Sequence, residues 1–424
     1  MIKSIHIQNF KSINDLKLDL GSFNVLIGEN GCGKSNILEG IAFGAAASAD
    51  KLDPEFLGSR GVRVTNPEFM FSAFQKKKAN SKIEICFDIY DYMFDSAEYI
   101  LSNTEMKPNT WVDETRYADW MISKNIMSMT FPDSDPNLDE QTQKSRDIKN
   151  MKSRFEKLTK VLNSFKKTDE SFKRADEMLK EIATINLEDF VGGFRDRLAN
   201  TKYQNKTISD FITYSPEESS LRKFEDSTQI YPIGIKGAGL FQYIKEINGD
   251  KKYKKTLKAI KKNLMLLDWY DDFELPKNLM QNEYKLQIRD KYLEPSLQYF
   301  DQRSTNEGFL YLLFYSVLFI SDETPQFFGI DNIDASFNPK LCMKLTQNLA
   351  ALAKKYDKQA IVTTHNPAIL DGLDLKNDDH RLFVVRRNEK GHTIANRIEY
   401  NSKRKKKLSE IWTDGFIGGL PENF

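Results

Sequence analysis

Residues 28 to 35 carry the pattern Gly-x-x-x-x-Gly-Lys-Ser, which is a complete phosphate-binding loop of the Walker A type. Glycines in such a loop let the backbone turn its N–H groups toward phosphate, the lysine adds a positive charge, and the serine hydroxyl is a Mg²⁺ ligand. We therefore predict that ATP and Mg²⁺ bind here. Cys32 occupies a variable position, where packing is expected rather than chemistry. The residues expected to line the nucleotide are Gly28, Glu29, Asn30, Gly31, Cys32, Gly33, Lys34, Ser35 and Asn36.

An apolar stretch that ends in an aspartate, Phe327 to Asp331, has the form of a Walker B strand. Asp331 is expected to hold Mg²⁺ through water, together with the Ser35 hydroxyl. The next residue is Asn332, whose amide cannot accept a proton where a glutamate usually assists the attacking water. A general base contributes about 10²–10⁴ to a rate. Hydrolysis is therefore predicted to be slow, unless Asp334 replaces the missing carboxylate, and whether the chain is an active ATPase stays open here.

His365 follows an apolar stretch, Ile361 to Thr364, and precedes Asn366 and Pro367. A histidine at the carboxyl end of a strand, in a sheet that also carries a phosphate-binding loop, can hydrogen-bond a γ-phosphate. The alternative is a structural histidine in a turn. The presence of the two motifs above favours the γ-phosphate role.

The elements expected to position these residues are those of an α/β fold. Phe23 to Ile27 predicts a buried strand that runs into the loop, and Ser35 to Ala47 predicts the helix that must follow it. Alternating apolar residues predict a hairpin over Ile2 to Leu20 and a strand over Ser81 to Tyr90. Further elements are expected at Lys251 to Lys262, Tyr284 to Ile288, Phe309 to Ile320, Lys340 to Lys355, Gln359 to Thr364 and Arg381 to Arg387.

Between the two motif regions, Asn137 to Val191 contains neither glycine nor proline and spaces its apolar residues by three and four. This predicts one or two long helices, and an ordinary helical subdomain is favoured over an intermolecular coiled coil. We therefore expect an ATPase head built from an N-terminal lobe, residues 1–95, and a C-terminal lobe, residues 284–424. Residues 96–283 would form an inserted, mainly helical arm or lid.

Charge and composition restrict the partners. The chain has 62 basic and 61 acidic residues, so no overall field attracts it to nucleic acid or membrane. Three scattered cysteines suit a reducing cytoplasm, and no apolar run approaches the roughly 18 residues that span a bilayer. Basic clusters at Lys76 to Lys78, Lys251 to Lys262 and Lys403 to Lys407 could contact nucleic-acid phosphates, although solvated lysine faces are the favoured interpretation.

Four motifs together resemble the ABC-type ATPases of the RecF, SMC and OLD branch. They are the opening Ile-x-Ile-x-Asn-Phe-Lys-Ser-Ile, the loop Gly-Glu-Asn-Gly-x-Gly-Lys-Ser-Asn, the Walker B strand and Thr-Thr-His-Asn-Pro. Within that branch the chain is most similar to RecF-like AAA ATPases of bacterial anti-phage systems such as Septu and PARIS. The resemblance covers about residues 1–95 and 285–424.

The resemblance implies that two heads enclose two ATP molecules, and that a signature loop of each head caps the γ-phosphate bound by the other. In this chain the loop before the helix Phe309 to Ile320 has the right place and ends at Gly308. Either Asn306 stands where the family has a serine, or Ser304 serves with altered spacing. The segment Ile333 to Pro339 resembles the loop that crosses the dimer interface. Gln75 would be the metal-sensing glutamine.

We thus expect a cytoplasmic ATP-binding protein that dimerises, or forms larger homo-oligomers, around slowly hydrolysed ATP. The resemblance implies a sensor or regulatory subunit of an anti-phage system, which controls a separately encoded effector such as a nuclease or toxin. The rival is a RecF-like DNA-binding ATPase of repair or recombination, and a third alternative is a nearly inert ATP-bound scaffold. The segment Leu408 to Phe424 is apolar enough to dock on the head or on a partner.

Overall fold

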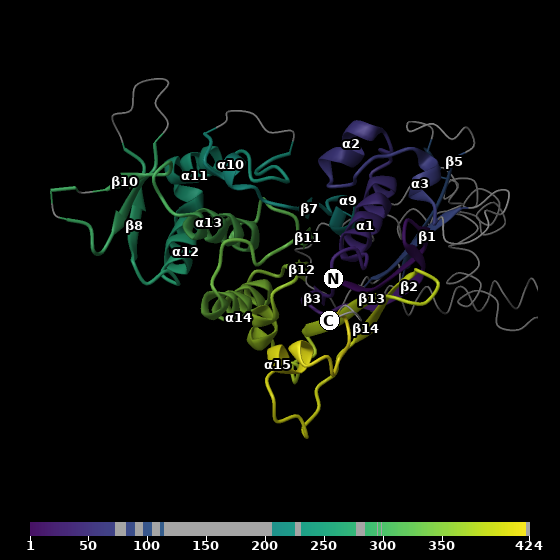
Figure 1. The fold of residues 1–424 in the computed structure, drawn as a ribbon. Coiled ribbons are helices and arrows are strands. Elements are labelled where there is room, and N and C mark those ends of the chain that lie inside the picture. The colour runs from purple at the N-terminus through teal and green to yellow at the C-terminus, as the bar shows by residue number, and fades with distance from the viewer. Residues whose placement is uncertain are drawn as a thin grey trace, which may run out of the picture. The chain divides into compact units, whose positions relative to one another are not determined.

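The computed structural model describes residues 1–72, 82–89, 96–103, 111–113, 206–224, 230–276, 285–294, 296–297 and 299–420. By its contacts the chain divides into one unit of Met1–Glu114 with Gln204–Phe424, and a second of Thr115–Tyr203. The second unit lies outside the described residues, and so do the predicted helices of Asn137 to Val191, together with Gln75 and Lys76 to Lys78. The following description concerns the first unit (Figure 1).

A six-stranded sheet at the centre of this unit carries both nucleotide motifs. Its strand order is β14-β13-β3-β12-β11-β7, and all neighbours are parallel except β13 and β14. All residues of β3 and β12 are buried, because helices cover both faces of the sheet. The strands are β3 (Phe23–Ile27), β7 (Thr213–Tyr214), β11 (Phe327–Ile330), β12 (Gln359–Thr364), β13 (His380–Arg387) and β14 (Thr393–Arg397).

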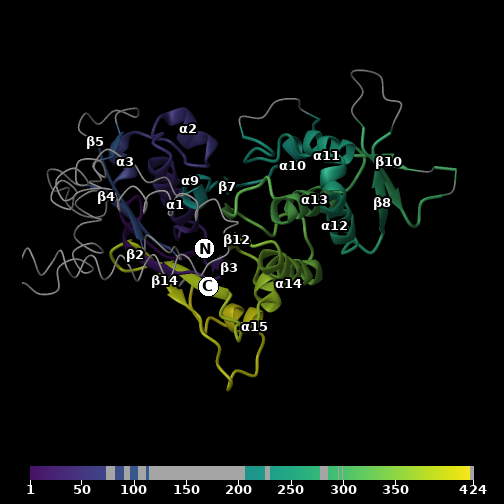
Figure 2. The same cartoon turned by 180° about the vertical axis from the view of Figure 1, so that it is seen from behind.

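Helix α1 (Lys34–Ser48) lies on one side of this sheet, and α13 (Glu307–Ile320) and α14 (Pro339–Lys355) lie on the other, as both views show (Figures 1 and 2). Every residue of α13 from Phe309 to Ile320 is buried, as expected for a helix that is apolar all round. It is the centre of an aromatic-rich core, in which α14 contributes a single apolar face.

An antiparallel sheet with the order β2-β1-β4-β5-β6 packs beside α1. The predicted hairpin is confirmed, since β1 pairs with β2 in antiparallel register. The predicted strand at Ser81 to Tyr90 is confirmed as β4, which pairs with β1. The strands are β1 (Ile2–Phe10), β2 (Ile13–Asp19), β4 (Ile83–Ile89), β5 (Ser96–Asn103) and β6 (Trp111–Asp113).

The remaining described elements surround α13 or connect the sheets. A small sheet has the order β10-β9-β8, and α12, which follows η2, packs against α13. Of the strand predicted at Tyr284 to Ile288, Tyr284 lies outside the described residues, and the described strand is β9 at Gln287–Asp290. The elements are α2 (Pro54–Ser59), α3 (Pro67–Met70), α9 (Lys206–Ser209), α10 (Glu218–Leu221), α11 (Leu240–Gly249), η2 (Lys251–Tyr253), α12 (Lys254–Leu264), β8 (Tyr270–Glu274), β10 (Phe300–Asp301), η3 (Pro367–Gly372) and α15 (Leu408–Thr413).

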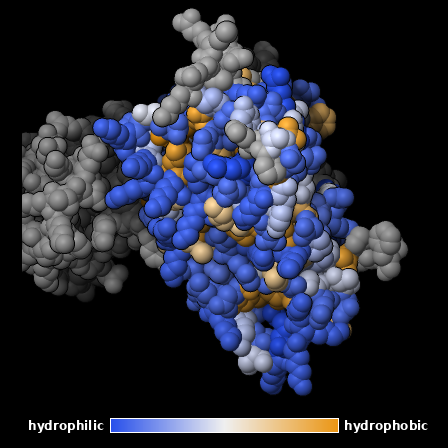
Figure 3. Space-filling model, turned by 90° about the vertical axis from the view of Figure 1, so that its left-hand side faces the viewer, coloured by the Kyte–Doolittle hydropathy of each residue, from blue (hydrophilic) through white to orange (hydrophobic). Residues whose placement is uncertain are grey.

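The α/β class is confirmed, but this division of the chain differs from the predicted boundaries 1–95, 96–283 and 284–424. Strands β5 and β6 extend the sheet of β1 and β4, and β7 pairs with β11 beside the Walker B aspartate. Backbone pairing therefore joins β5, β6 and β7 to the head, although the sequence pattern of these strands is weak. The loop with Lys403 to Lys407, the lowest in Figures 1 and 3, is hydrophilic.

Among the described residues no helix combines the length and apolarity needed to cross a membrane.

Candidate nucleotide-binding site

The phosphate-binding loop connects the end of β3 to the start of α1 and lies tightly against β13 and β14. A Cβ atom at Gly28 would lie 2.1 Å from the Val385 carbonyl oxygen. A Cβ at Gly33, where φ is +107°, would lie 2.0 Å from Thr393 Oγ1. Only glycine fits at these two positions, and the free N-terminus of α1 faces the loop, as anion binding requires.

Side chains of β13, β14 and the β1–β2 turn hold this loop from outside. Arg387 donates from Nε to the Gly31 carbonyl oxygen at 2.8 Å, and Thr393 donates from Oγ1 to the Cys32 carbonyl oxygen at 2.9 Å. The Ser12 hydroxyl lies 2.6 Å from Thr393 Oγ1. The outward carbonyl groups are thereby satisfied, and the loop is fixed before any nucleotide arrives.

Lys34 and His365 meet at the centre of the site. Lys34 is buried, with 5% of its surface exposed, and its Nζ donates to the carbonyl oxygens of Gly28 and Glu29, both at 2.9 Å. The same Nζ lies 3.5 Å from His365 Nδ1. Burial lowers the pKa of Lys34, and Cys32, Asp331 and Asp334 act in the opposite direction.

The electrostatic environment keeps the His365 ring neutral. Burial is the first cause that lowers the pKa of His365, the Lys34 charge is the second, and the carboxylate of Asp334 opposes them. A ring that is neutral at pH 7 carries one N–H group and one acceptor nitrogen. It is therefore suited to donate one hydrogen bond to a phosphate oxygen without adding a second charge beside Lys34. Burial also raises the pKa of the Cys32 thiol, in keeping with a packing role.

The predicted Mg²⁺ ligands lie next to each other. The Ser35 hydroxyl donates to Asp331 Oδ2 at 2.9 Å, and the Thr363 hydroxyl donates to Asp331 Oδ1 at 2.5 Å. Hydroxyl and carboxylate oxygens are the ligand types that Mg²⁺ prefers, so this pair fits the ion. The two side chains come from α1 and from the end of β11, at the same edge of the central sheet.

Asn332 has an unusual backbone conformation directly after Asp331. Its φ is +57°, and its backbone N–H donates to Thr363 Oγ1 at 2.9 Å, while the residue itself is exposed. Asparagine and aspartate tolerate the left-handed region better than glutamate does. The local backbone therefore supplies a physical reason why the residue at this position is not glutamate.

Asp334 is turned toward the end of β12. Its Oδ1 accepts a hydrogen bond from the Thr364 hydroxyl at 2.6 Å, and its charge acts on the pKa of His365. Thr363 and Thr364 thus orient Asp331 and Asp334 respectively. Neither threonine was predicted to have a role, although both directly precede His365 in the sequence.

The signature-like loop lies at the start of α13. Asn306 is the N-cap residue, and its Oδ1 accepts from the Phe309 backbone N–H at 2.9 Å. Ser304 is exposed, and its hydroxyl donates to Asp301 at 3.2 Å. Arg222, which the sequence analysis missed, donates from Nη1 to the carbonyl oxygens of Gln302, Arg303 and Thr305 at 3.2, 3.0 and 2.8 Å. Arg222 therefore fixes a loop that lies about 80 residues later in the sequence. No local sequence pattern indicates a contact over this separation.

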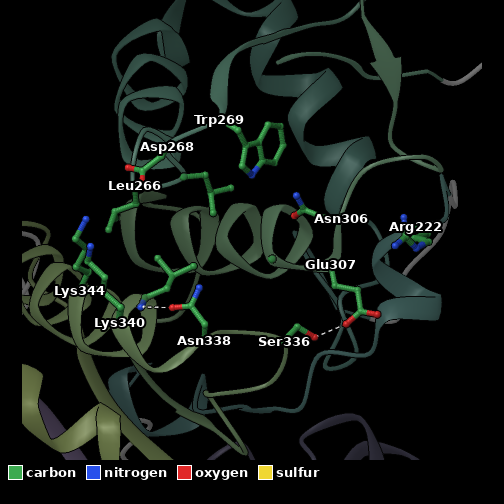
Figure 4. A pocket seen from close by; sticks show the side chains of 13 residues that line it. Arg222, Leu266, Asp268, Trp269, Asn306, Glu307, Ser336, Asn338, Lys340 and Lys344 are labelled. Atoms are coloured by element: carbon green, nitrogen blue, oxygen red, sulfur yellow. Dashed lines mark hydrogen bonds between the residues drawn. The ribbon is translucent and has the colours of Figure 1, made fainter. Parts of the chain in front are cut away.

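A cavity of about 610 Å³ opens at this loop (Figure 4). Asn306 and Gly308 line it from α13, and Asn338 and Lys340 line it from α14. Asn338 caps α14 as Asn306 caps α13, accepting from the Leu341 backbone N–H at 2.9 Å. No residue of the phosphate-binding loop lines this cavity.

The structure therefore separates the predicted site residues into two groups. The first group, at the carboxyl edge of the central sheet, contains the phosphate-binding loop with Lys34 and Ser35, and also Asp331, Asp334 and His365. The second group, at the start of α13, contains Ser304, Asn306 and Gly308. Gln75 lies outside the described residues.

Comparison with known proteins places this site in a family. The family model of the AAA ATPase domain matches residues 1–370, which includes both groups of residues. Among curated proteins, Uncharacterized protein MJECL10 of Methanocaldococcus jannaschii is 51% identical over 43 residues, which are 10% of this chain and 20% of that protein. The match thus spans about a fifth of that relative.

Two solved structures are similar over nearly the whole length of the chain. An SMC head bound to the C-winged helix domain of ScpA is similar with a TM-score of 0.51 and 14% identity, over 96% of this chain and 99% of that one. The SMC head domain from Thermotoga maritima is similar with a TM-score of 0.44 and 13% identity, over 94% and 99% of the two chains. The first likeness confirms an SMC-head-like α/β fold across nearly the whole chain.

Proposed function

Because the chain belongs to the AAA ATPase domain family, we propose that it binds ATP with Mg²⁺ at the phosphate-binding loop and that bound ATP joins two heads. The observation that carries this proposal is the convergence of Lys34, Ser35, Asp331 and His365 at one edge of the central sheet. Hydrolysis of the bound ATP is proposed to be slow.

Each of these residues has a role that follows from its chemistry. The N–H groups of the loop and the start of α1 bind the phosphates, and the Lys34 ammonium adds a charge beside them. Ser35 and Asp331 would hold Mg²⁺, which supplies charge neutralisation on the phosphate oxygens when it is bound. Neutral His365 donates a hydrogen bond toward the γ-phosphate. Thr363 keeps the Asp331 carboxylate in place through its 2.5 Å hydrogen bond.

Slow hydrolysis is supported by the surroundings of Asn332 and Asp334. The side chain of Asn332 is an amide, which cannot accept a proton as a carboxylate does. The left-handed backbone conformation of Asn332 disfavours the glutamate that usually stands at this position. Asp334 carries a carboxylate, but Thr364 holds it at the end of β12. A water molecule that attacks the γ-phosphate therefore receives less help than in a head with a free glutamate.

Dimerisation is supported by the separation of the two groups of site residues. Asn306 and Gly308 lie at a cavity to which the chain's own phosphate-binding loop contributes nothing. Two capped helix N-termini, of α13 and α14, open toward this cavity, and such termini favour an anion. We propose that the γ-phosphate held by a second copy occupies it.

The cellular role that we propose is that of a regulatory subunit in bacterial anti-phage defence, which acts in the cytoplasm on a separately encoded nuclease or toxin. The support is the resemblance of the motif set to RecF-like ATPases of such systems. A phage challenge of cells that express the native locus, including the neighbouring reading frames, tests it. Protection should be lost with Lys34→Ala, and protection that persists with this variant would contradict the proposal.

DNA binding in repair is the second candidate function, and one observation favours it. Lysines on η2 and α12 are exposed along one side of the helix, at Lys251, Lys255, Lys258 and Lys262. A row of cations of this kind suits a phosphate backbone. This candidate predicts that affinity for duplex DNA falls steeply with salt and that DNA stimulates ATP turnover, whereas the regulatory role requires neither.

The dimer is tested by the mass of the particle in solution. Light scattering coupled to size-exclusion chromatography should give a dimer or larger assembly with ATP and Mg²⁺, and a smaller particle without nucleotide. Lys34→Ala should abolish the change in mass. A mass that is the same with and without ATP would contradict the proposed mechanism.

A further inference from the structure

The segment Leu408–Leu420, hereafter the strap, returns from the last strands to the nucleotide site. It begins with α15, whose Ile411 is 8% exposed, and continues through Trp412 and Ile417, which pack against the core that α13 and α14 share with the central sheet. No motif in this segment indicates a chemical role. Its contacts nevertheless fall on two elements of the site described above.

The first contact joins the strap to the turn after His365. Asp371, in η3, accepts from the Ser409 backbone N–H at 3.0 Å and from the Ser409 hydroxyl at 2.7 Å. Helix α15 packs along η3, which begins at Pro367, two residues after His365. The two hydrogen bonds to one carboxylate fix both the position and the direction of α15 relative to that turn.

The second contact joins the strap to the phosphate-binding loop. Gly419 is buried and has a φ of +81°. A Cβ atom at this position would lie 2.6 Å from Val384 Cγ1 and 3.7 Å from the Cα atom of Gly28. Val384 of β13 therefore leaves no room for a side chain at this position, and a Cβ atom here would be in ordinary van der Waals contact with Gly28, the first residue of the loop.

These contacts connect the strap to both sides of the pair formed by Lys34 and His365. Gly28 accepts from Lys34 Nζ at 2.9 Å, Lys34 lies 3.5 Å from His365, and the turn after His365 is held by Ser409 of the strap. A displacement of the strap thus acts on both ends of the contact between Lys34 and His365. Conversely, a nucleotide that orders Gly28 and His365 restricts the strap, because coupling between two sites is reciprocal.

The docked strap also contains three glycines in the left-handed region and one buried donor without a partner in the described part of the chain. Gly415 and Gly418, like Gly419, have positive φ angles, of +79° and +72°. The indole N–H of Trp412 is buried without an acceptor among the described residues. A buried donor without a partner weakens the packed arrangement, so the docked position responds to small changes at its contacts.

We propose that the strap is a positioning element of the nucleotide site, which holds Gly28 and the turn after His365 in the arrangement that binds ATP. This inference rests on the ATP-binding part of the proposed function, and it is independent of dimerisation and of the cellular role. It assigns the strap no contact with the nucleotide itself.

The test compares two alanine substitutions at adjacent glycines. Gly419→Ala places a methyl group against Val384 and beside Gly28, whereas Gly418→Ala has a similar positive φ but meets no atom within 4 Å. Both carry the backbone strain, and only the first adds a clash, with Val384 of β13, that must shift the strap where it lies beside Gly28. Gly419→Ala is expected to weaken ATP binding by roughly fivefold or more relative to Gly418→Ala. The loss should be larger for ATP than for ADP, because the turn positions His365, the proposed donor to the γ-phosphate.

Hydrogen exchange on the wild-type protein gives a second measurement that needs no variant. Amides of residues 408–420 should exchange more slowly with a non-hydrolysable ATP analogue than without nucleotide. Equal or tighter ATP binding by Gly419→Ala relative to Gly418→Ala overturns the inference, as does exchange that the analogue leaves unchanged. Either of these negative results leaves the proposed function intact as long as the wild type binds ATP. A wild type that binds no ATP overturns both the proposed function and this inference.

Discussion

At the scale of single residues, the site is made by contacts that link separate motifs. Ser35 and Asp331 are almost 300 residues apart, yet their oxygens lie 2.9 Å from each other. The motif types predicted this pair, because a phosphate-binding loop and a Walker B strand share one function. The roles of Thr363 and Thr364 depend on which way their hydroxyl groups point, and that direction is set by the pairing of β12 with β11.

Lys34→Ala should remove the charge that the buried site is built around. The expected loss of ATP affinity is at least about thirtyfold, or ~2 kcal/mol, as for one member of a buried charged pair. Isothermal titration with ATP and Mg²⁺ measures it. Lys17→Ala, which removes an exposed lysine of β2, is the control and should bind as the wild type does. Equal affinity of Lys34→Ala and Lys17→Ala would contradict the assignment.

Asn306→Asp tests the signature-like loop without breaking the helix that carries it. Aspartate keeps the N-cap hydrogen bond of α13 and suits the helix dipole, so thermal stability should be retained. The new negative charge repels a γ-phosphate from a second copy, so ATP-dependent assembly should be lost while ATP binding stays. The same substitution at Asn66, which precedes α3, is the control. Assembly that is unchanged in Asn306→Asp would exclude this cavity as the contact.

At the scale of elements, the sequence predicts those whose residues carry a strong pattern of their own. The run before the loop, the helix after it, the buried helix α13 and strand β12 are found where apolar periodicity placed them. Strands β7 and β10 are two residues long and exist only because a neighbour pairs with them. No local sequence pattern predicts such strands. No local pattern predicts the part of β9 that differs from the expected strand either.

A buried lysine directly before β12 should change the stability of the head when it titrates. Lys358 is 2% exposed, and its Nζ donates to the Thr324 carbonyl oxygen and hydroxyl and to the Pro325 carbonyl oxygen. Burial lowers the pKa of Lys358 from its ordinary value of 10.5 to about 8. Between these values the unfolded chain holds more protons, so the free energy of unfolding rises with pH over this interval.

Comparison with Lys358→Met isolates this effect. The stability of the wild type relative to the variant should rise by about 2–3 kcal/mol from below pH 8 to above pH 10, as chemical denaturation at several pH values would show. Lys355→Met, at an exposed lysine near the end of α14, should give a difference that is flat over the same range. A flat difference for Lys358→Met as well would mean that the ammonium is not held in a desolvated position.

At the scale of the whole molecule, the described unit is an ATPase head whose two lobes share one central sheet. The order of motifs along the chain predicted this arrangement, because the phosphate-binding loop lies near residue 28 and the Walker B aspartate at 331. The extent of the insertion was not predictable in the same way, since β5, β6 and β7 join the head through pairing. The contact between the strap and Gly28 also escaped prediction, because it depends on a close approach of two backbones.

The central claim is that the head holds ATP because Asn332 stands where a general base would act. The most direct measurement is the steady-state rate of phosphate release by the wild type, Asn332→Glu and Asp334→Asn. The wild type should release phosphate slowly. Asn332→Glu should release it faster, by up to about 10²-fold, which is the lower bound for general-base catalysis. The left-handed backbone at this position should reduce that gain. Asp334→Asn should leave the slow rate nearly unchanged. An ordinary wild-type rate with no gain in Asn332→Glu, or a wild-type rate that Asp334→Asn abolishes, would contradict it.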